Sequence, residues 1–545
     1  ESIEFDEGDE TDFDSTVQTQ STVPNDPYYI AGNQWGLNAI NTPQAWDTTT
    51  GNSSSTPMSE RVMVGVIDSG AADHPDLTDN IYWDMARDFY KDTEKVGKAA
   101  VTDDTTGHGT HVSGIIGAKG NNGTGVSGVC WNIAIVPLQV LITEGEYKGK
   151  FDGNAIRDAF RYAINKNIPI LNCSYGDLSD DESAISFMRI YKGLIVCSAG
   201  NDGVNTDLNP QMPSCLDLDN IISVANADSS YALDNSSNYG VSTVDIAAPG
   251  SEILSTVPTS VNSTGYKMWS GTSMAAPHVA GVAALILSVR PGLPGTHLKY
   301  LLTAYASGMG ELTGKVANGA FLNASAAVNG ALSDTVKITF NVSGGTCDES
   351  YRYYVNGQTY WDLPIPTRQG YNFAGWYTAS SGGTKHSETT AVSGARTLYA
   401  HWEVATYTIE YDSNGGDVCP EATTIDGGSS HTITSYTNRE GRKFTGWKRA
   451  GDDKLYLPGD TITNIWENIT FVAQWERIYK VLTYESKYFD AGTWTQTVDL
   501  YDTLSSGGKI PCSILEQPGV GSYIFQGWKI KGGDGTVYQA GGSGT

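Results

Sequence analysis

Unbroken runs of apolar residues alternate with amphipathic stretches over about the first 330 residues of the chain. The apolar runs end in turn residues and have the length of buried parallel strands. They cover residues 62–67, 133–140, 168–173, 194–197 and 221–225. Helical patterns lie between and after them, at 108–118, 154–165, 183–191, 272–290 and 297–305. This alternation predicts an α/β fold in which helices flank both faces of a parallel sheet.

The pattern changes at about residue 334, where helical periodicity ends and Tyr, Thr, Trp and Gly dominate. Alternating β-branched and aromatic residues between glycines predict small β-rich modules. Three copies of one pattern follow, each with a Gly-Trp pair that ends at Trp376, Trp447 or Trp528, and the third copy stops at Thr545 before its closing strand. We therefore predict an α/β domain and three β-rich repeats after a short leader. Their boundaries are 1–24 for the leader, 25–334 for the α/β domain, and 335–403, 404–476 and 477–545 for the repeats, the last one truncated.

The net charge of the chain excludes some classes of binding partner. The chain carries 61 acidic and 34 basic side chains and a net charge of -27, which argues against nucleic-acid and anionic-lipid binding. The leader begins with eight acids in fourteen positions and no base, as is typical of a disordered segment or the remnant of a pro-segment. No apolar run reaches the length of about 18 residues that crosses a bilayer, so we expect no transmembrane segment. The composition fits a soluble, exported protein.

Ser273 lies near the start of a buried helix, in Gly271-Thr-Ser-Met-Ala-Ala-Pro-His278. The free N–H groups and the dipole at a helix start favour a developing negative charge. A serine becomes a nucleophile only when a base takes its proton and a third group orients that base. His108 begins a predicted helix and Asp68 ends a predicted strand, so these two side chains are the candidates for base and orienting group.

Other site chemistries fit the sequence less well. An α/β-hydrolase elbow needs G-x-S-x-G, and Ala275 occupies the place of its last glycine. A zinc site of the H-E-x-x-H type needs a glutamate between its histidines, which His108 and His111 lack. We expect His111 and His278 to be packed side chains. The seven cysteines form no CxxC pair and indicate neither a disulfide scaffold nor a zinc ribbon.

Three segments carry a family resemblance. Asp68-Ser-Gly, His108-Gly-Thr-His-Val and the segment around Ser273 resemble, in this order, the signatures of the subtilisin-like serine proteases. The resemblance covers about residues 25–330. It implies that Ser273 attacks the peptide carbonyl, that His108 takes its proton and later protonates the leaving amine, and that Asp68 holds the histidine tautomer. Asn201, in Cys197-Ser-Ala-Gly-Asn201, is the implied oxyanion donor together with the backbone N–H of Ser273.

The resemblance also implies two segments that pair with an extended substrate backbone. The residues implied in substrate binding are Ser174, Tyr175, Gly176, Ser198, Ala199, Gly200 and Asp202. Tyr175 is bulkier than the leucine usual at its place, so we expect altered pockets for the residues before the cleaved bond. Asp202 follows the oxyanion asparagine and leads to the hypothesis of a basic residue at P1, the position before that bond.

A calcium site is implied as well. Asp26, Asp76 and the loop at 119–126 resemble the tight calcium site of thermitase-like members, and hard oxygen ligands suit Ca²⁺. The implied side-chain ligands are Asp26, Asp76 and Asn122, and the implied carbonyl ligands are Lys119, Thr124 and Val126. An ordinary Asn-Gly turn is the alternative interpretation of the loop.

The two complete repeats resemble the B-type repeats of internalin B and related Gram-positive and Bacteroides surface proteins, which are β-grasp-like. Together the resemblances imply a bacterial serine endopeptidase that is secreted or attached to the cell surface and cuts protein or peptide substrates. The repeats would act as spacers, or as adhesive modules toward cell-wall or host-surface partners. The alternative is a surface adhesin whose protease-like domain no longer cuts.

Overall fold

A computed structural model describes residues 22–90, 96–102, 104–142, 149–176, 182–484, 494–499, 528–529 and 537–538. The chain divides into two compact units. One comprises residues 1–341, 349–364 and 376–399, and the other comprises residues 342–348, 365–375 and 400–545. Most of the predicted leader and of the third repeat lie outside the described residues, so these two segments stay predictions.

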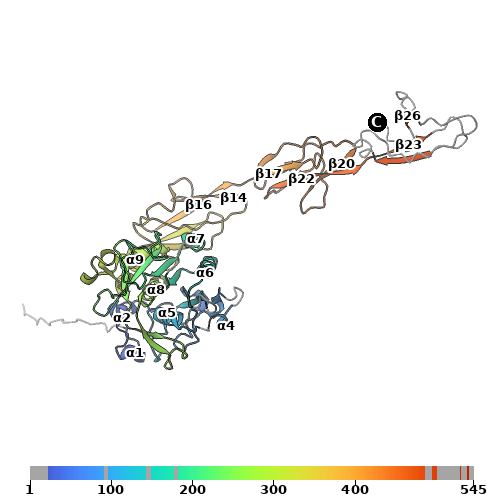
Figure 1. Cartoon of the computed structure of the whole chain (residues 1–545). Helices are drawn as coiled ribbons and strands as arrows, with labels where there is room; N and C mark the ends of the chain where they lie inside the picture. Colours follow the sequence, from blue (N-terminus) through green and yellow to red (C-terminus); the bar gives the residue numbers. More distant parts are fainter. Residues whose placement is uncertain are drawn as a thin grey trace, which may run out of the picture. The chain divides into compact units, whose positions relative to one another are not determined.

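A nine-stranded sheet with the order β10-β11-β7-β6-β5-β4-β1-β3-β2 organises the first unit (Figure 1). All neighbours pair in parallel except β10 and β11. The strands are β1 Met63–Asp68, β2 Arg87–Asp88, β3 Ala134–Gln139, β4 Ile170–Cys173, β5 Leu194–Ser198, β6 Ile221–Ala227, β7 Ile246–Pro249, β10 Ser307–Gly308 and β11 Ala320–Phe321. The five predicted strands are β1, β3, β4, β5 and β6, so the predicted parallel sheet is confirmed.

Helices cover both faces of this sheet. Successive residues of a strand point to opposite faces, and in β5 Leu194 and Val196 join one apolar core, whereas Ile195 and Cys197 join another. Helices α5 and α8 contribute to the first core, and α6 and α7 to the second. The helices are α1 Pro27–Ile30, α2 Trp35–Ala39, α3 Thr42–Trp46, α4 Lys98–Val101, α5 His108–Gly117, α6 Gly153–Asn165, α7 Glu182–Ile190, α8 Thr272–Val289, α9 Gly295–Ala304 and α10 Ala324–Asp334. The predicted α/β class is thereby confirmed.

Helix α8 is apolar on all sides because it runs through the core. Among the described residues it is the one helix long and apolar enough to cross a membrane, yet 83% of it is buried inside the fold. Core helices of this kind pass the same test of length and composition. A hairpin of β8 (Ile253–Thr256) and β9 (Tyr266–Trp269) leads directly into α8.

The first two repeats share one topology. In the first, β12 (Thr335–Asn341) pairs antiparallel with β13 (Tyr351–Val355) and parallel with β16 (Arg396–Val404). In the second, β17 (Thr406–Asp412) pairs in the same way with β18 (Thr423–Asp426) and β22 (Ile469–Arg477). The remaining strands are β14 Tyr371–Tyr377, β15 Lys385–His386, β19 His431–Thr432, β20 Arg442–Arg449, β21 Thr461–Ile462, β23 Tyr479–Tyr484, β24 Trp494–Asp499, β25 Trp528–Lys529 and β26 Val537–Tyr538. The predicted β-rich character of the first two repeats is confirmed.

The Gly-Trp pair has the same physical role in both complete repeats. Trp376 and Trp447 are buried, and each indole N–H donates to a backbone carbonyl, at 2.8 Å and 3.0 Å. The preceding residues, Gly375 and Gly446, have φ of 133° and 151°, a conformation that a side chain disfavours. Glycine therefore turns the strand so that the next ring enters the core.

Part of the first repeat belongs to the first unit. β12 begins at the residue after α10 ends. The imidazole of His297 in α9 accepts a hydrogen bond from the Val355 N–H at 2.9 Å and donates one to the Thr359 carbonyl at 2.7 Å. Arg290, just after α8, lies over the ring of Tyr353 at 4.9 Å. These contacts attach the β13 region to the α/β core, while the predicted boundary at 334/335 stays a prediction.

Candidate active site

Asp68 and His108 form a hydrogen-bonded pair at the carboxyl end of the inner strand β1. Asp68 is the last residue of β1 and is fully buried, and His108 is the first residue of α5, with its side chain 27% exposed. His108 Nδ1 lies 2.8 Å and 2.9 Å from the two carboxylate oxygens of Asp68. This contact fixes the proton on Nδ1 and leaves Nε2 as the basic nitrogen. Burial lowers the pKa of His108, but the charge and hydrogen bond of Asp68 outweigh it and hold the pKa above its ordinary value.

Ser273 is the second residue of α8, the helix that packs against α5. The preceding Gly271 has φ of 149°, so the chain enters the helix by a turn that suits glycine. In the described part of the chain, Ser273 Oγ donates to the Ser174 carbonyl at 3.2 Å and has no hydrogen bond to His108. Catalytic hydrogen bonds are often long without substrate and tighten in the complex. At this helix start the N–H groups of Thr272 and Met274 donate to Asn201 Oδ1 and to the Gly271 carbonyl, whereas the Ser273 N–H has no acceptor within the described residues.

Asn201 is held by the same helix start. Its Oδ1 accepts from the Thr272 N–H at 2.9 Å and from the Thr272 hydroxyl at 3.1 Å. The Asn201 side-chain NH₂ has no acceptor within the described residues, and Asn201 itself is exposed. An amide held through its oxygen presents its N–H groups in one direction, which is what an oxyanion donor requires.

The two implied substrate segments follow neighbouring strands. Ser174 comes after β4 and donates through Oγ to the Ser273 carbonyl at 3.1 Å, while Gly176 is exposed. Ser198 ends β5, and Gly200 has φ of 104°, with the Asn238 amide nitrogen only 2.3 Å from where a Cβ would lie. A side chain at residue 200 would therefore distort this segment.

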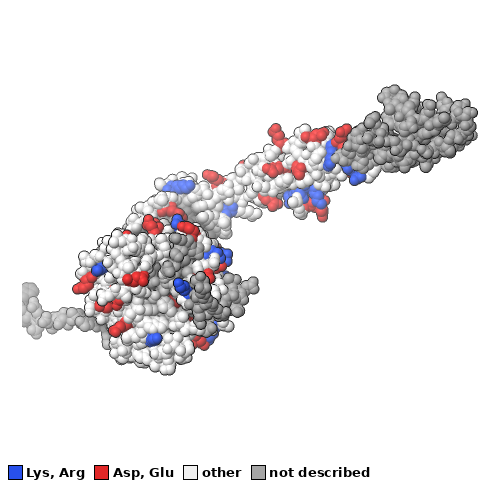
Figure 2. Space-filling model, in the orientation of Figure 1, with Lys and Arg blue, Asp and Glu red and all other residues white. Residues whose placement is uncertain are grey.

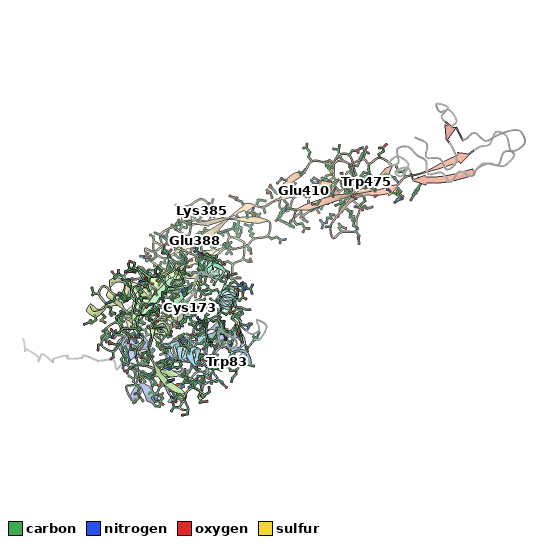
Figure 3. All side chains as sticks on the ribbon, in the orientation of Figure 1. Trp83, Cys173, Lys385, Glu388, Glu410 and Trp475 are labelled. Atoms are coloured by element: carbon green, nitrogen blue, oxygen red, sulfur yellow. The ribbon has the colours of Figure 1, made fainter. Side chains whose placement is uncertain are left out.

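The side chain of Tyr175 points into the core instead of into solvent. It is 3% exposed, and its ring lies 5.3 Å from that of Phe151. Cys173, at the end of β4 (Figure 3), belongs to the same core. Asp202 is exposed and accepts a hydrogen bond from the Gln211 side chain at 3.0 Å. Of these residues, Asp202 is therefore the charged one that a substrate can reach.

His111 and His278 are packed side chains, as the sequence suggests. His111 lies in the turn of α5 after His108, and its Nε2 lies 2.9 Å from the Lys267 carbonyl and 3.1 Å from the Ile253 carbonyl. Its ring stacks on Trp269 at 4.8 Å. Burial lowers the pKa of His111 to about 3 and that of His278 to about 4. Both imidazoles are therefore neutral near pH 7.

The implied calcium ligands come together around two buried carboxylates. Asp26 and Asp76 are both fully buried, and neither pairs with Lys or Arg in the described part of the chain. Asp26 accepts from the N–H groups of Asn121 and Asn122, and Asp76 accepts from the Asn122 side chain and the Val126 N–H. Burial raises the pKa of Asp76 to about 6, and the charge of Asp26 adds to the increase.

Two unpaired buried carboxylates beside an amide and a loop of carbonyl groups fit a hard cation. No three His, Cys, Asp or Glu side chains gather as a metal site within the described residues. The implied set is consistent with this result, because it contains only two carboxylates. Lys119, Thr124 and Val126 would contribute carbonyl oxygens and not side chains.

Sequence reasoning did not single out Thr272 or Asn238. Thr272 fixes the Asn201 amide and also accepts from the Gly200 N–H at 3.2 Å. Asn238 donates to the Ala199 carbonyl at 3.0 Å and accepts from the Asp202 N–H at 3.0 Å. Thr272 is adjacent to the nucleophile in the motif, which is a usable signal. Asn238 lies 36 residues from Asp202, and no local pattern marks it.

Known protein families match two parts of the chain. The subtilase family matches residues 59–332, and the Listeria-Bacteroides repeat domain matches residues 337–401 and 407–474. A protease structure from Pseudoalteromonas arctica is 28% identical, covers 57% of this chain and 100% of that chain, and has a TM-score of 0.48.

Two curated relatives show how far the similarity extends. Thermitase from Thermoactinomyces vulgaris is 35% identical over 49% of this chain and 86% of thermitase. Subtilisin-like protease 2 from Plasmodium falciparum is 36% identical over 47% of this chain, but the match spans only 19% of that relative. By its matched domain and its similarity to thermitase, the chain belongs to the subtilase family of serine endopeptidases.

Proposed function

We propose that this chain is a secreted or cell-surface serine endopeptidase that hydrolyses peptide bonds through an acyl-enzyme intermediate on Ser273. The observation that carries the proposal is the contact of His108 Nδ1 with both oxygens of the buried Asp68 carboxylate, at 2.8 Å and 2.9 Å. Ser273 and Asn201 meet at the start of the neighbouring helix α8 through Thr272. Base, orienting group, nucleophile and oxyanion donor thus come from separate segments of the chain and supply the four roles of this chemistry.

The reaction follows from these roles. His108 Nε2 takes the Ser273 proton while Oγ forms a bond to the substrate carbonyl carbon, and the carbonyl oxygen becomes negative. The Asn201 N–H and the Ser273 backbone N–H stabilise that oxygen. His108 then gives the proton to the leaving amine as the C–N bond breaks. A water that His108 deprotonates in the same way attacks the acyl-enzyme, and Ser273 leaves with the proton that His108 returns. Asp68 keeps the tautomer and stabilises the imidazolium in both steps.

Substrate would bind as an added strand. The backbone segments 174–176 and 198–200 follow adjacent parallel strands, β4 and β5, so an extended peptide placed between them can bond to both. The buried ring of Tyr175 leaves its backbone as the contribution to binding. Asp202 supplies an exposed negative charge beside Asn201. We therefore expect protein or peptide substrates with a preference for Lys or Arg at P1.

Cleavage of a peptide library tests this function and this preference together. We expect the full chain to cut internal peptide bonds, with Lys or Arg enriched at P1. Asp202→Asn should lower kcat/KM for basic P1 by up to roughly fivefold, because one exposed charge pair contributes at most about 1 kcal/mol. The matched control is Asp228→Asn, which removes an acid that bonds only to its own turn, at Ser230 and Ala232. Enrichment of apolar P1 would refute the preference, and no cleavage at all would refute the function.

Calcium would be held by Asp26, Asp76 and Asn122 with the carbonyls of Lys119, Thr124 and Val126. When bound, the ion would neutralise two buried carboxylates and stabilise the loop at 119–126. A ligand present at one hundred times its Kd stabilises by about 2.7 kcal/mol. We therefore expect chelation to lower Tm by roughly 3–4 °C for a unit of this size, measured calorimetrically in the Ser273→Ala background.

Asp76→Asn should make that Tm insensitive to the chelator. Asp73→Asn is the matched control, since Asp73 is exposed and pairs with Lys98, and this variant should keep the full calcium response. An unchanged Tm on chelation in the unmodified chain would mean that the 119–126 loop is an ordinary turn.

The charge distribution and the repeats bear on the substrates and the location of the protein. Figure 2 shows acidic and basic side chains in small separate groups on the face in view, without a continuous basic surface. This distribution and the net charge of -27 support substrates other than nucleic acids. The match to surface-protein repeats supports a secreted or surface-attached bacterial protein, in which the repeats act as spacers or as adhesive modules.

A further inference from the structure

Asp104 is a buried carboxylate that none of the assigned catalytic roles uses. It lies in the loop before α5 and is 2% exposed. Its Oδ1 accepts from the hydroxyls of Ser69 and Thr106, at 2.8 Å and 3.1 Å, and from the Gly107 N–H at 2.9 Å. Its Oδ2 accepts from the N–H and the hydroxyl of Thr110, at 2.9 Å and 2.6 Å. Burial raises the pKa of Asp104, whereas the hydrogen bonds of Thr110 and Ser69 act in the opposite direction. Two of the five donors are backbone N–H groups, which suit an ionised carboxylate.

These contacts connect the backbone next to Asp68 with the backbone next to His108. Ser69 follows Asp68, and its hydroxyl donates to Asp104 while it accepts from the Gly109 N–H at 2.9 Å. Gly107 and Gly109 are the neighbours of His108 on either side. One carboxylate thus joins the end of β1 to the first turn of α5, where the backbone N–H groups have no partner within the helix. The position of the imidazole relative to Asp68 depends on this junction.

The charges around His108 come from a small set of groups. Asp68 faces it from β1 and Asp104 from the preceding loop, and both raise its pKa. His111 faces it from the next turn of α5 and is neutral, because burial lowers its pKa to about 3. Trp269 of β9 stacks on the His108 ring at 6.3 Å and carries no charge. Asp104 is therefore the second negative charge available to the imidazolium that forms during catalysis.

We propose that Asp104 is a positioning residue for the Asp68–His108 pair, an inference that rests on the proposed peptidase function. It acts by fixing the first turn of α5 against the end of β1 and by stabilising the protonated state of His108. It touches neither the substrate nor Ser273.

The test is Asp104→Asn in the full chain. Asparagine keeps the size of the side chain but has no charge and only one acceptor oxygen for five donors. We expect kcat/KM per titrated active site to fall by roughly tenfold to a hundredfold, as for small misplacements of a catalytic group. The acid limb of the kcat/KM profile should move to lower pH. The NMR titration of the His108 Nδ1 proton, recorded in the Ser273→Ala background, should move in the same direction.

Asn323→Ala is the matched control, because it also removes a side-chain acceptor from a helix start, that of α10, far from His108 in the chain. It should lower Tm and leave kcat/KM and the His108 titration unchanged. If Asp104→Asn behaved in the same way, Asp104 would be structural and the proposal would be wrong. A loss of kcat/KM with an unchanged His108 titration would also overturn it.

Peptide cleavage and the His108 titration test the peptidase function and the role of Asp104 separately. A chain that cleaves no peptide but whose His108 titration still shifts would refute the peptidase and support the positioning. If Asp104→Asn did not fold, Ser69→Ala would test the same junction by removing one donor. We then expect a severalfold loss of kcat/KM with little change in Tm, and an unchanged kcat/KM would refute the role.

Discussion

Ser273→Ala is expected to lower kcat for peptide hydrolysis by about 10⁶-fold, the loss known for the nucleophile of subtilisin, a member of the same family. The substitution removes the only atom that can form the acyl bond, while Asn201 and the backbone still bind the substrate. The fold should be unaffected, because among the described residues Ser273 Oγ makes one hydrogen bond, to the Ser174 carbonyl. KM should therefore change little. The measurement is hydrolysis of a fluorogenic peptide, combined with mass-spectrometric mapping of a serine-directed fluorophosphonate.

Ser288→Ala in the same helix is the matched control. Its hydroxyl donates to the Leu285 carbonyl and contacts Thr49, so it belongs to the core of α8 and not to the site. This variant should keep full activity and full labelling. Fluorophosphonate should attach to Ser273 in the unmodified chain and in Ser288→Ala, and to neither serine in Ser273→Ala. An intact chain that is not labelled would favour an adhesin with an inactive protease-like domain.

The parts of the fold and of the site that could be predicted are those that depend on short, local sequence patterns. The apolar runs predicted the five main strands because a strand that is buried on both faces consists mostly of apolar residues. Asp68, His108 and Ser273 each stand at the end of a predicted element, where a polar side chain near a buried backbone indicates function. The Gly-Trp pairs marked the repeats because Gly375 and Gly446 adopt positive φ values before a buried ring.

The parts that could not be predicted depend on contacts between distant residues. Whether Tyr175 faces a pocket or the core is decided by Phe151 beside it, and the sequence does not give that neighbour. Asn238 and Asp104 lie in loops that contain many other polar residues, so only their hydrogen bonds in the structure distinguish these two. The attachment of His297 to residues 355 and 359 crosses the change in composition at about residue 334, where the sequence favours a domain boundary.

Acid is expected to destabilise the first unit steeply, because three of its buried histidines are neutral. Burial lowers the pKa of His111 to about 3 and those of His278 and His297 to about 4. The unfolded chain binds these protons near pH 6.5, so the stability is present above that pH and is lost as the pH falls toward 4. Each histidine contributes a slope of about 1.4 kcal/mol per pH unit. The raised pKa values of Asp76 and His108 act in the opposite direction, and excess calcium would remove the part due to Asp76.

His297→Gln isolates one of these protons. Glutamine retains one donor and one acceptor for the Thr359 carbonyl and the Val355 N–H, but it does not titrate. Between pH 6.5 and 4, the free energy of unfolding of the unmodified chain should fall by about 3 kcal/mol more than that of this variant. Both are measured by urea unfolding in the Ser273→Ala background.

The control is Asn323→Ala, which removes a helix cap worth about 1 kcal/mol and should lower the free energy of unfolding equally at every pH. Parallel pH profiles for His297→Gln and the unmodified chain would mean that His297 binds its proton as readily in the folded as in the unfolded state. Protonation would break the bond from Val355 and leave two positive charges, His297 and Arg352, near each other in a buried region. The attachment of the β13 region to the α/β core is therefore expected to be one of the acid-sensitive contacts of the first unit.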